Sequence, residues 1–352
     1  MASFHEIFGQ ARPIKILQSI LQTQNVPNAL LFTGEDGIGK RSSAMIFIQA
    51  LLCQNISLNN PLNPPFLKGG DINPCDTCLP CKKIQSGNHP DFLTIAPIEG
   101  ERSIKINDIL AMQDMIHFEP IDAKRKVVLI AEAETMTAQA QNSLLKTLEE
   151  APPYALLVLI AAKPGLLAPT LLSRCQKVPF SPLSLSQIES ILMEKKRWST
   201  GDARLVAAFT GGKLGEALSL EKEEARAKEE ALNSLVKEEN LSHYNTLFEM
   251  AKSHTANVES MEHALYYLSA YFRDILVMLM VKGDALTDSS ILVFSWRKEE
   301  IMRWANKMST EDVTRFLADI AAIQQTLSRN INKQLALETL LMQMRDKLGT
   351  TV

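Results

Sequence analysis

Ala29-Leu30-Leu31-Phe32-Thr33-Gly34-Glu35-Asp36-Gly37-Ile38-Gly39-Lys40 is the stretch of sequence that decides the fold of this chain. Its first five residues are mostly apolar and predict a buried strand. The glycine-rich segment that follows is typical of a turn whose backbone N–H groups hold phosphate at the start of a helix. The stretch therefore predicts a nucleotide-binding α/β domain. Its candidate phosphate-binding residues are Gly34, Gly37, Gly39 and Lys40.

Two metal ligands that a nucleotide hydrolase needs near this loop are missing. A Ser or Thr hydroxyl after the loop lysine ordinarily holds Mg²⁺, and here that position is Arg41. An aspartate is expected at the end of another buried strand, where Val127–Ile130 run instead into Ala131 and Glu132. Both losses affect the same ion, so the sequence predicts no Mg²⁺-dependent hydrolysis. The retained loop leaves binding of ATP or ADP open.

The bulk composition predicts a multidomain cytoplasmic protein. A chain of 352 residues is too long for one compact core and indicates two or three domains. No apolar run reaches the roughly 20 residues that span a bilayer, and the first residues lack a secretion pattern, so no membrane partner is expected. The net charge of −3 gives no general attraction to nucleic acid. Any contact with DNA must then depend on local basic patches or on a complex.

Short apolar runs alternate with amphipathic helical patterns in the first half of the chain, which predicts an open parallel sheet with helices on both faces. Thr137 is a candidate N-cap for a helix that Pro152-Pro153 ends. The strand candidates are Ala29–Thr33, Phe92–Ala96, Val127–Ala131, Leu156–Ala161 and Gln176–Phe180.

Strand patterns disappear after Pro182, and the remainder has helical periodicity. The composition shifts predict an α/β domain at 1–180, a small helical domain at 181–225 and a larger helical domain at 226–352. The aromatic stripe at 266–272 is interpreted as helix packing rather than as a surface on which bases stack. The Pro-rich stretch 61–70 is interpreted as an exposed insertion without a function.

Four cysteines predict a structural zinc site. Cys75, Cys78 and Cys81 are spaced as Cys-x-x-Cys-x-x-Cys, and Cys53 precedes them. Four thiolates suit a closed tetrahedral Zn²⁺ site, although Cys53 is the least secure ligand because 21 residues separate it from Cys75. A redox dithiol is the alternative, but nothing in the sequence supplies its surrounding fold. Cys175 is interpreted as a small core residue.

Two further motifs resemble one protein family. Residues 140–153, Ala-Gln-Asn-Ser-Leu-Leu-Lys-Thr-Leu-Glu-Glu-Ala-Pro-Pro, and Leu171-Leu172-Ser173-Arg174-Cys175 resemble motifs of bacterial replicative clamp loaders, which are AAA+ proteins. The cysteine insertion after the loop helix is also shared by these subunits. The resemblance implies a P-loop AAA+ parallel-sheet domain with a zinc module at about 53–81, a small helical lid, and an all-α C-terminal collar that assembles the subunits.

The resemblance also implies a role for Arg174. In this family the Ser-Arg-Cys arginine projects into the ATP site of the adjacent subunit as an arginine finger. The alternative without a catalytic role is an arginine paired with a surface carboxylate. Ala161 and Gly215 stand where active subunits are expected to carry their two nucleotide-sensing residues.

By resemblance, the chain is a non-hydrolysing stator subunit that helps to load the sliding clamp onto primer-template DNA during replication. Its partners would be gamma/tau motor subunits and a delta subunit in a hetero-pentamer within the DNA-directed DNA polymerase holoenzyme. The alternative within the family is an active gamma/tau-type motor, which needs the lost metal ligands. A stand-alone zinc module for nucleic acid would need more basic residues than Lys82 and Lys83. A branch-migration helicase would also need hydrolysis.

Overall fold

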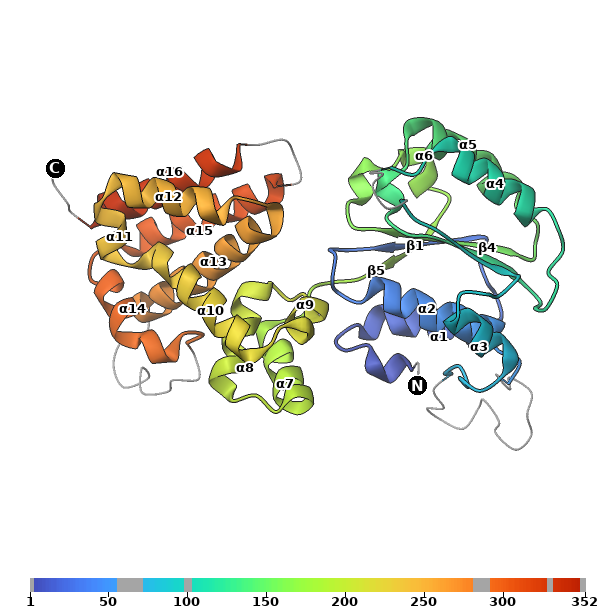
Figure 1. The fold of residues 1–352 in the computed structure, drawn as a ribbon, viewed down its shortest axis with the longest axis horizontal. Helices are drawn as coiled ribbons and strands as arrows, with labels where there is room; N and C mark the ends of the chain where they lie inside the picture. The colour runs from blue at the N-terminus through green and yellow to red at the C-terminus, as the bar shows by residue number, and fades with distance from the viewer. Residues whose placement is uncertain (1–2, 56–71, 98–102, 281–291, 328–331, 349–352) are drawn as a thin grey trace. The chain divides into compact units, whose positions relative to one another are not determined.

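The computed structural model describes residues 3–55, 72–97, 103–280, 292–327 and 332–348 (Figure 1). The chain forms two compact units, Met1–Pro182 and Leu183–Val352. The predicted three-part division, with limits near 180 and 225, stays a prediction. The Pro-rich stretch 61–70 lies outside the described residues.

A five-stranded parallel sheet forms the centre of the N-terminal unit, in the order β2-β3-β4-β1-β5. Parallel pairing requires crossover connections, and helices supply them. This sheet, together with the cysteine cluster and the helices of the described part of the second unit, confirms the predicted fold class. The strands are β1 (Ala29–Thr33), β2 (Phe92–Ile95), β3 (Lys126–Ile130), β4 (Ala155–Ala161) and β5 (Gln176–Pro179).

The strands differ in how far they are buried. Every residue of β3 and β4 is buried, and so are the first four of β1, as expected for strands covered on both faces. The two edge strands are less buried. In β5 only Val178 is buried, and in β2 only Ile95 is. An edge strand has one neighbour, so part of its surface stays open to solvent.

Helices cover both faces of the sheet (Figure 1). One face carries α1, α2 and α3 and has a core that includes Phe32 and Phe47. The opposite face carries α4, α5 and α6 and has a core that includes Leu144 and Leu157. These helices are α1 (Ala11–Thr23), α2 (Lys40–Leu52), α3 (Leu79–Gln85), α4 (Ile106–Ile116), α5 (Ala138–Glu150) and α6 (Pro169–Leu172).

Helices make up the described part of the C-terminal unit. The longest of them, α13, packs against α8, α14 and α15. They are α7 (Leu185–Lys196), α8 (Thr200–Thr210), α9 (Leu214–Ser219), α10 (Lys222–Asn233), α11 (Glu238–Ser242), α12 (Tyr244–His254), α13 (Val258–Met280), α14 (Lys298–Ala305), α15 (Thr310–Thr326) and α16 (Lys333–Lys347).

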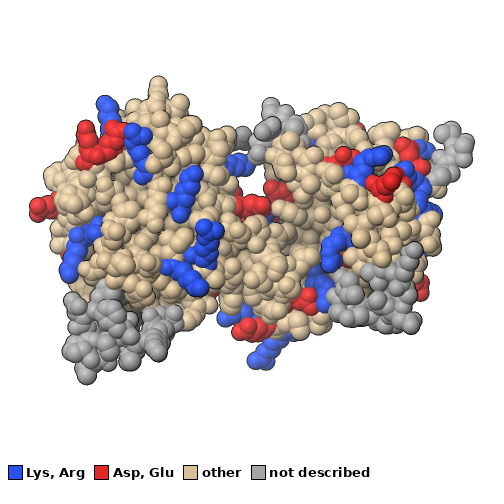
Figure 2. Space-filling model, turned by 180° about the vertical axis from the view of Figure 1, so that it is seen from behind, with Lys and Arg blue, Asp and Glu red and all other residues tan. Residues whose placement is uncertain are grey.

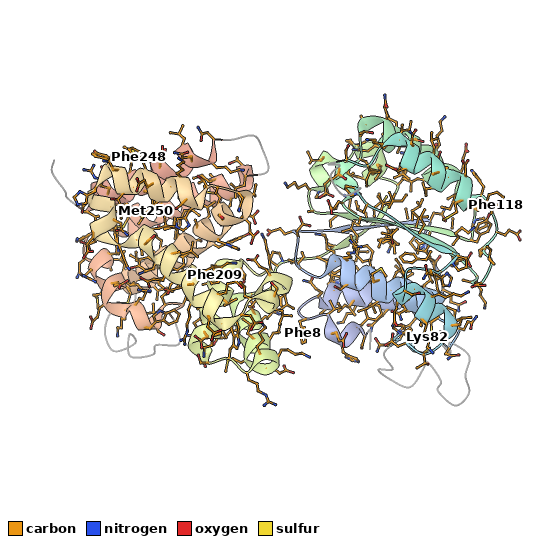
Figure 3. The ribbon with its side chains drawn as sticks, viewed as in Figure 1. Phe8, Lys82, Phe118, Phe209, Phe248 and Met250 are labelled. Atoms are coloured by element: carbon orange, nitrogen blue, oxygen red, sulfur yellow. The ribbon has the colours of Figure 1, made fainter. Side chains whose placement is uncertain are left out.

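Aromatic side chains fill the interior of this unit. Tyr267, Tyr271 and Phe272 of α13 are fully buried, which confirms helix packing for these three members of the aromatic stripe, while Tyr266 is half-buried. Phe209 lies inside the unit, whereas Phe248 reaches its surface (Figure 3). Among the described residues, no helix is both long and apolar enough to cross a membrane.

Helix α5 begins and ends where the sequence predicts. Thr137 is its N-cap, and the Thr137 side chain accepts a hydrogen bond of 3.2 Å from the backbone N–H of Ala140. The helix ends at Glu150, just before Pro152 and Pro153. A hydroxyl acceptor at the N-cap satisfies one of the four N–H groups that have no partner within the helix.

Replacing Thr137 by Ala should lower the free energy of unfolding by about 1 kcal/mol, because that N–H loses its acceptor. Gln139→Ala is the matched control, since Gln139 is exposed in the same turn, and it should change the free energy by less than about 0.5 kcal/mol. Urea unfolding of both variants measures the difference. Equal values for the two variants would show that the cap does not stabilise α5.

Candidate functional site

The glycine-rich loop leaves β1 at Thr33 and ends where α2 begins at Lys40. Gly34 has φ +135°, and a Cβ there would lie 2.5 Å from the carbonyl oxygen of Phe180, so only glycine fits. Gly39 has φ +94° and is the N-cap of α2. The loop therefore delivers the backbone N–H groups of a 13-residue helix to the end of the sheet, which is a favourable place for an anion.

The Lys40 side chain turns back into this loop and is only 5% exposed. Its Nζ donates hydrogen bonds to the carbonyl oxygens of Gly34 and Glu35, and it lies 3.4 Å from Oδ1 of Asp36. Burial lowers the pKa of Lys40, and the Asp36 carboxylate opposes that shift. The ammonium group is thus bonded to the loop itself, and a phosphate would have to replace these acceptors.

The position after Lys40 offers no metal ligand. Arg41 is exposed in the first turn of α2, and a guanidinium group has no lone pair for a cation. The nearest hydroxyl that is buried in this helix, on Ser43, donates 2.9 Å to the carbonyl oxygen of Gly39. The loop therefore has the geometry of an anion site without the side chain that would bind Mg²⁺.

The end of β3 also lacks a metal ligand. Ala131 is buried, with 4% of its surface exposed, and its methyl group cannot bind a cation. Glu132 follows with φ +53° and is exposed. Ala161, at the end of β4, is fully buried. Gly215 lies in α9 of the other unit and has no side chain.

Glu134 is a site residue that the sequence analysis did not identify. Its Oε1 accepts hydrogen bonds from the backbone N–H groups of Ala162, at 2.8 Å, and Lys163, at 3.2 Å. Its Oε2 is buried without a hydrogen-bond partner among the described residues. The carboxylate therefore holds the segment after β4 in place. The acidic pattern 132–134 hinted at this residue, but not at its partners.

Arg174 lies on the surface between α6 and β5. Its Nη2 is 2.6 Å from Oε1 of Glu149, and its Nη1 donates to the carbonyl oxygen of Thr170 at 2.9 Å. The Arg174 side chain is 39% exposed and that of Glu149 is 53% exposed. An exposed ion pair contributes only about 0–1 kcal/mol. The pair therefore holds Arg174 weakly, and the side chain can leave it for a stronger anion.

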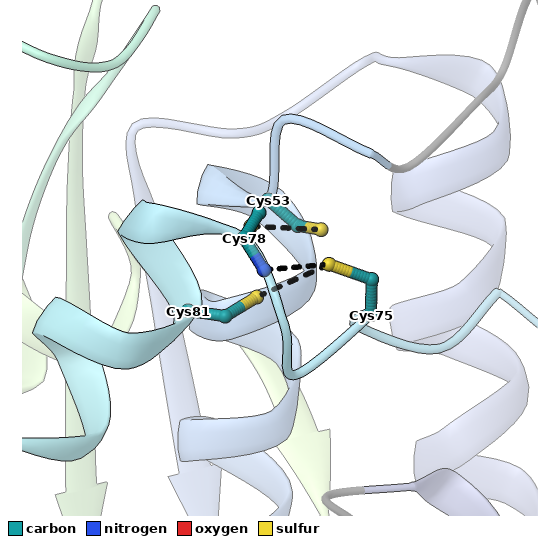
Figure 4. Close-up of side chains that lie close together, drawn as sticks. All are labelled: Cys53, Cys75, Cys78 and Cys81. Carbon is teal, nitrogen blue, oxygen red and sulfur yellow. Dashed lines mark hydrogen bonds between the residues drawn. The ribbon is translucent and has the colours of Figure 1, made fainter.

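Four thiols come together beside α2 and α3 (Figure 4). Cys53 follows the end of α2, Cys78 is the N-cap of α3, and Cys81 lies within α3. The Sγ atoms of Cys53 and Cys78 are 3.8 Å apart, and those of Cys75 and Cys81 are 4.0 Å apart. A tetrahedron with metal–sulfur bonds of about 2.3 Å has sulfur–sulfur edges of about 3.8 Å. The cluster, including Cys53, thus has the dimensions of a Zn²⁺ site.

The thiols differ in acidity. Burial alone would raise the pKa of Cys75, but hydrogen bonds from the Thr77 hydroxyl and from the backbone N–H groups of Cys78 and Thr77 lower it to about 6. Burial raises the pKa values of Cys53 and Cys81. Metal binding requires thiolates, and Cys75 ionises more readily than Cys53 or Cys81. Cys175 lies apart in the apolar core, where burial raises its pKa to about 11.

One face of the molecule carries its basic side chains in scattered positions. Figure 2 shows lysine and arginine residues as separate groups that uncharged surface divides. Lys15 of α1 and Lys177 of β5 are exposed on the N-terminal unit, and Lys82 follows the cysteines. Figure 3 places Lys82 on the α3 side of the sheet. The face in Figure 2 thus shows no continuous basic patch, in agreement with the near-neutral net charge.

Comparison with known proteins identifies relatives of the whole chain. A family model described as DNA polymerase III, delta subunit, matches residues 9–184. The DNA polymerase III subunit delta' of Bacillus subtilis (strain 168) is 30% identical over 341 residues, which is 96% of this chain and 96% of that protein. The subunit tau of the same organism is 30% identical over 222 residues, 62% of this chain but only 37% of tau.

A solved structure gives a more distant match. The DNA polymerase III gamma subunit-related protein of Thermotoga maritima aligns with 95% of this chain and 99% of its own, with 20% sequence identity and a TM-score of 0.41. The family assignment depends on the sequence matches, which extend over both units. The chain belongs to the family of DNA polymerase III delta-prime subunits.

Proposed function

We propose that this protein is a non-hydrolysing stator subunit of the DNA polymerase III clamp loader. One observation carries the proposal: Arg41 and Ala131 stand where a hydrolase needs its two Mg²⁺ ligands. Without the ion, an enzyme cannot neutralise the charge that develops on the transferred phosphoryl group. Lys40 alone, buried in its own loop, supplies neither an ion nor a positioned water.

Arg174 is the chemical contribution of this subunit. Its guanidinium group acts on ATP bound by a neighbouring motor subunit, where a positive charge supplied in trans is worth on the order of 10³–10⁵ in rate. The surface position of Arg174 and its weak pairing with Glu149 support this role. A triphosphate carries more negative charge than one carboxylate. The guanidinium group therefore binds the triphosphate more strongly than it binds Glu149.

The partners follow from the relatives, which are named as subunits of one polymerase. The gamma/tau and delta subunits join this chain in a hetero-pentamer, and the C-terminal helices at 226–352 form the collar that joins them. The assembly loads the sliding clamp onto primer-template DNA in the cytoplasm. The separate basic groups of Figure 2 support a DNA contact that is shared across the assembly rather than made by this chain alone.

The cysteine cluster holds a structural Zn²⁺ through Cys53, Cys75, Cys78 and Cys81. Four thiolates leave no position for substrate or water, so the ion stabilises the fold and does no chemistry. The cluster links the end of α2 to the start of α3. The ion therefore fixes the insertion to the helix that begins at the glycine-rich loop.

Arg174→Ala, assembled with gamma/tau and delta, should abolish hydrolysis at the one neighbouring ATP site that this arginine serves. Single-turnover ATP hydrolysis, measured with clamp and primed DNA, should lose the phase that this site contributes. Arg125→Ala is a matched control, because Arg125 also donates to a backbone carbonyl of the same unit. Glu149→Gln keeps Arg174 and removes its ion pair. It should leave unchanged the fast phase of hydrolysis, which is the phase that the neighbouring ATP site contributes.

Comparing Glu149→Gln with Arg174→Ala distinguishes action in trans from an effect of the ion pair within the chain. If Glu149→Gln slows hydrolysis as much as Arg174→Ala does, the ion pair within the chain is what matters. The proposal of action in trans is then wrong. If neither variant changes the fast phase while the assembly still forms, Arg174 has no role in hydrolysis.

The purified chain should contain one zinc ion per molecule, and Cys81→Ser should lower the zinc content to half or less. Inductively coupled plasma mass spectrometry measures the content. Removing the ion with a chelator should also lower Tm, because an ion that binds only the native state stabilises it. Cys175→Ser is the control and should keep its zinc. Full zinc content in Cys81→Ser would contradict the four-thiolate site.

A further inference from the structure

Gln10 is a buried polar residue whose side chain does not serve its own helix. It is the N-cap of α1, yet its side chain makes no capping hydrogen bond there. Only 2% of its surface is exposed. A buried amide needs partners for both its donor and its acceptor atoms, because an unpaired polar group is costly away from water.

The partners of Gln10 come from two distant segments. Its Nε2 donates to the carbonyl oxygen of Ser181 at 2.7 Å and to that of Ile38 at 3.3 Å. Its Oε1 accepts a hydrogen bond of 3.3 Å from the backbone N–H of Ser181. The amide thus pairs with both backbone polar groups of Ser181 while it also binds the loop. A carboxylate or a hydroxyl cannot make this combination of bonds.

One of these two segments is the glycine-rich loop, and the other connects β5 to the second unit. Ile38 belongs to the glycine-rich loop, and Ser181 follows β5, two residues before the second unit begins at Leu183. A direct contact joins the same segments, since Gly34 lies against the carbonyl of Phe180. Among the described residues, strand β5 pairs with β1 alone, and Arg174 lies two residues before the first residue of β5. On its other side, the end of β5 has no strand partner among the described residues.

We propose that Gln10 is a positioning residue that couples the glycine-rich loop to the segment through which the chain leaves the sheet. A change in the conformation of the loop moves the Ile38 carbonyl oxygen. The Gln10 amide, which is hydrogen-bonded to that oxygen, then moves and shifts Ser181. The coupling fixes the end of β5 and thereby the point from which the second unit continues. It requires no ATP hydrolysis and no neighbour, so it stands or falls independently of the proposed function.

Hydrogen–deuterium exchange of the full chain tests the first step. Gln10→Met keeps the length of the side chain and removes its hydrogen bonds. The Ser181 amide, which donates to Gln10, should then exchange about tenfold faster. Gln141→Met is a matched control. Gln141 is also buried, donates to the carbonyl oxygens of Met136 and Leu166, and accepts from the N–H of Ala168.

The control variant should speed exchange at Ala168 and leave Ser181 unchanged. Far-ultraviolet circular dichroism confirms that each variant is folded. If Gln10→Met unfolds the chain, Gln10→Ala gives a second test, because it also removes the oxygen that accepts the hydrogen bond from the Ser181 N–H. Unchanged protection of Ser181 in a folded Gln10 variant would overturn the proposal.

A second substitution distinguishes coupling from simple local support. Lys40→Met removes the ammonium that binds the carbonyl oxygens of Gly34 and Glu35. In the otherwise unchanged chain it should speed exchange at Ser181. In the Gln10→Met background it should add little further change. An equal effect of Lys40→Met in both backgrounds, or no effect in either, would show that Gln10 does not carry the coupling.

Discussion

The parallel pairing of β1, β3 and β4 is the constraint on which the rest of the N-terminal unit depends. Because these strands run in one direction, their carboxyl ends meet at one edge of the sheet, and that edge is where Gly34, Ala131 and Ala161 lie. Burial of β3 and β4 on both faces holds this edge rigid. The frame therefore brings these three positions together, and Ala131 and Ala161 offer only a methyl group there.

The charged groups of the unit divide between its interior and its surface. Lys40 is bonded to carbonyl oxygens of its own loop, and Glu134 uses one oxygen to hold the segment after β4. Arg174, in contrast, lies on the surface, where it makes an exposed ion pair with Glu149 and a hydrogen bond to the carbonyl oxygen of Thr170. On the proposed function this division has a simple meaning. The interior groups keep the sheet edge in shape, and the surface arginine acts on the site of another subunit.

Local patterns were sufficient to predict much of this structure. The strand 29–33 and the Thr137 cap were predicted directly, because burial periodicity and capping depend on neighbours in sequence. The four cysteines were grouped by their spacing and chemistry, and the fold brings Cys53 to them. The exposure of β2 and β5 was not predicted. It depends on their position at the edges of the sheet, and the sequence of a single strand does not reveal the strand order. Gln10 and Glu134 were missed because their partners lie far along the chain.

The steady-state rate of ATP hydrolysis by the purified chain, compared with that of its Lys40→Ala variant, tests the central claim most directly. The loss of both metal ligands predicts no turnover above the rate of the variant at any Mg²⁺ concentration. Turnover that depends on Mg²⁺ and disappears in Lys40→Ala would contradict the claim. Such a result would mean that other residues hold the ion and that this chain is itself a motor.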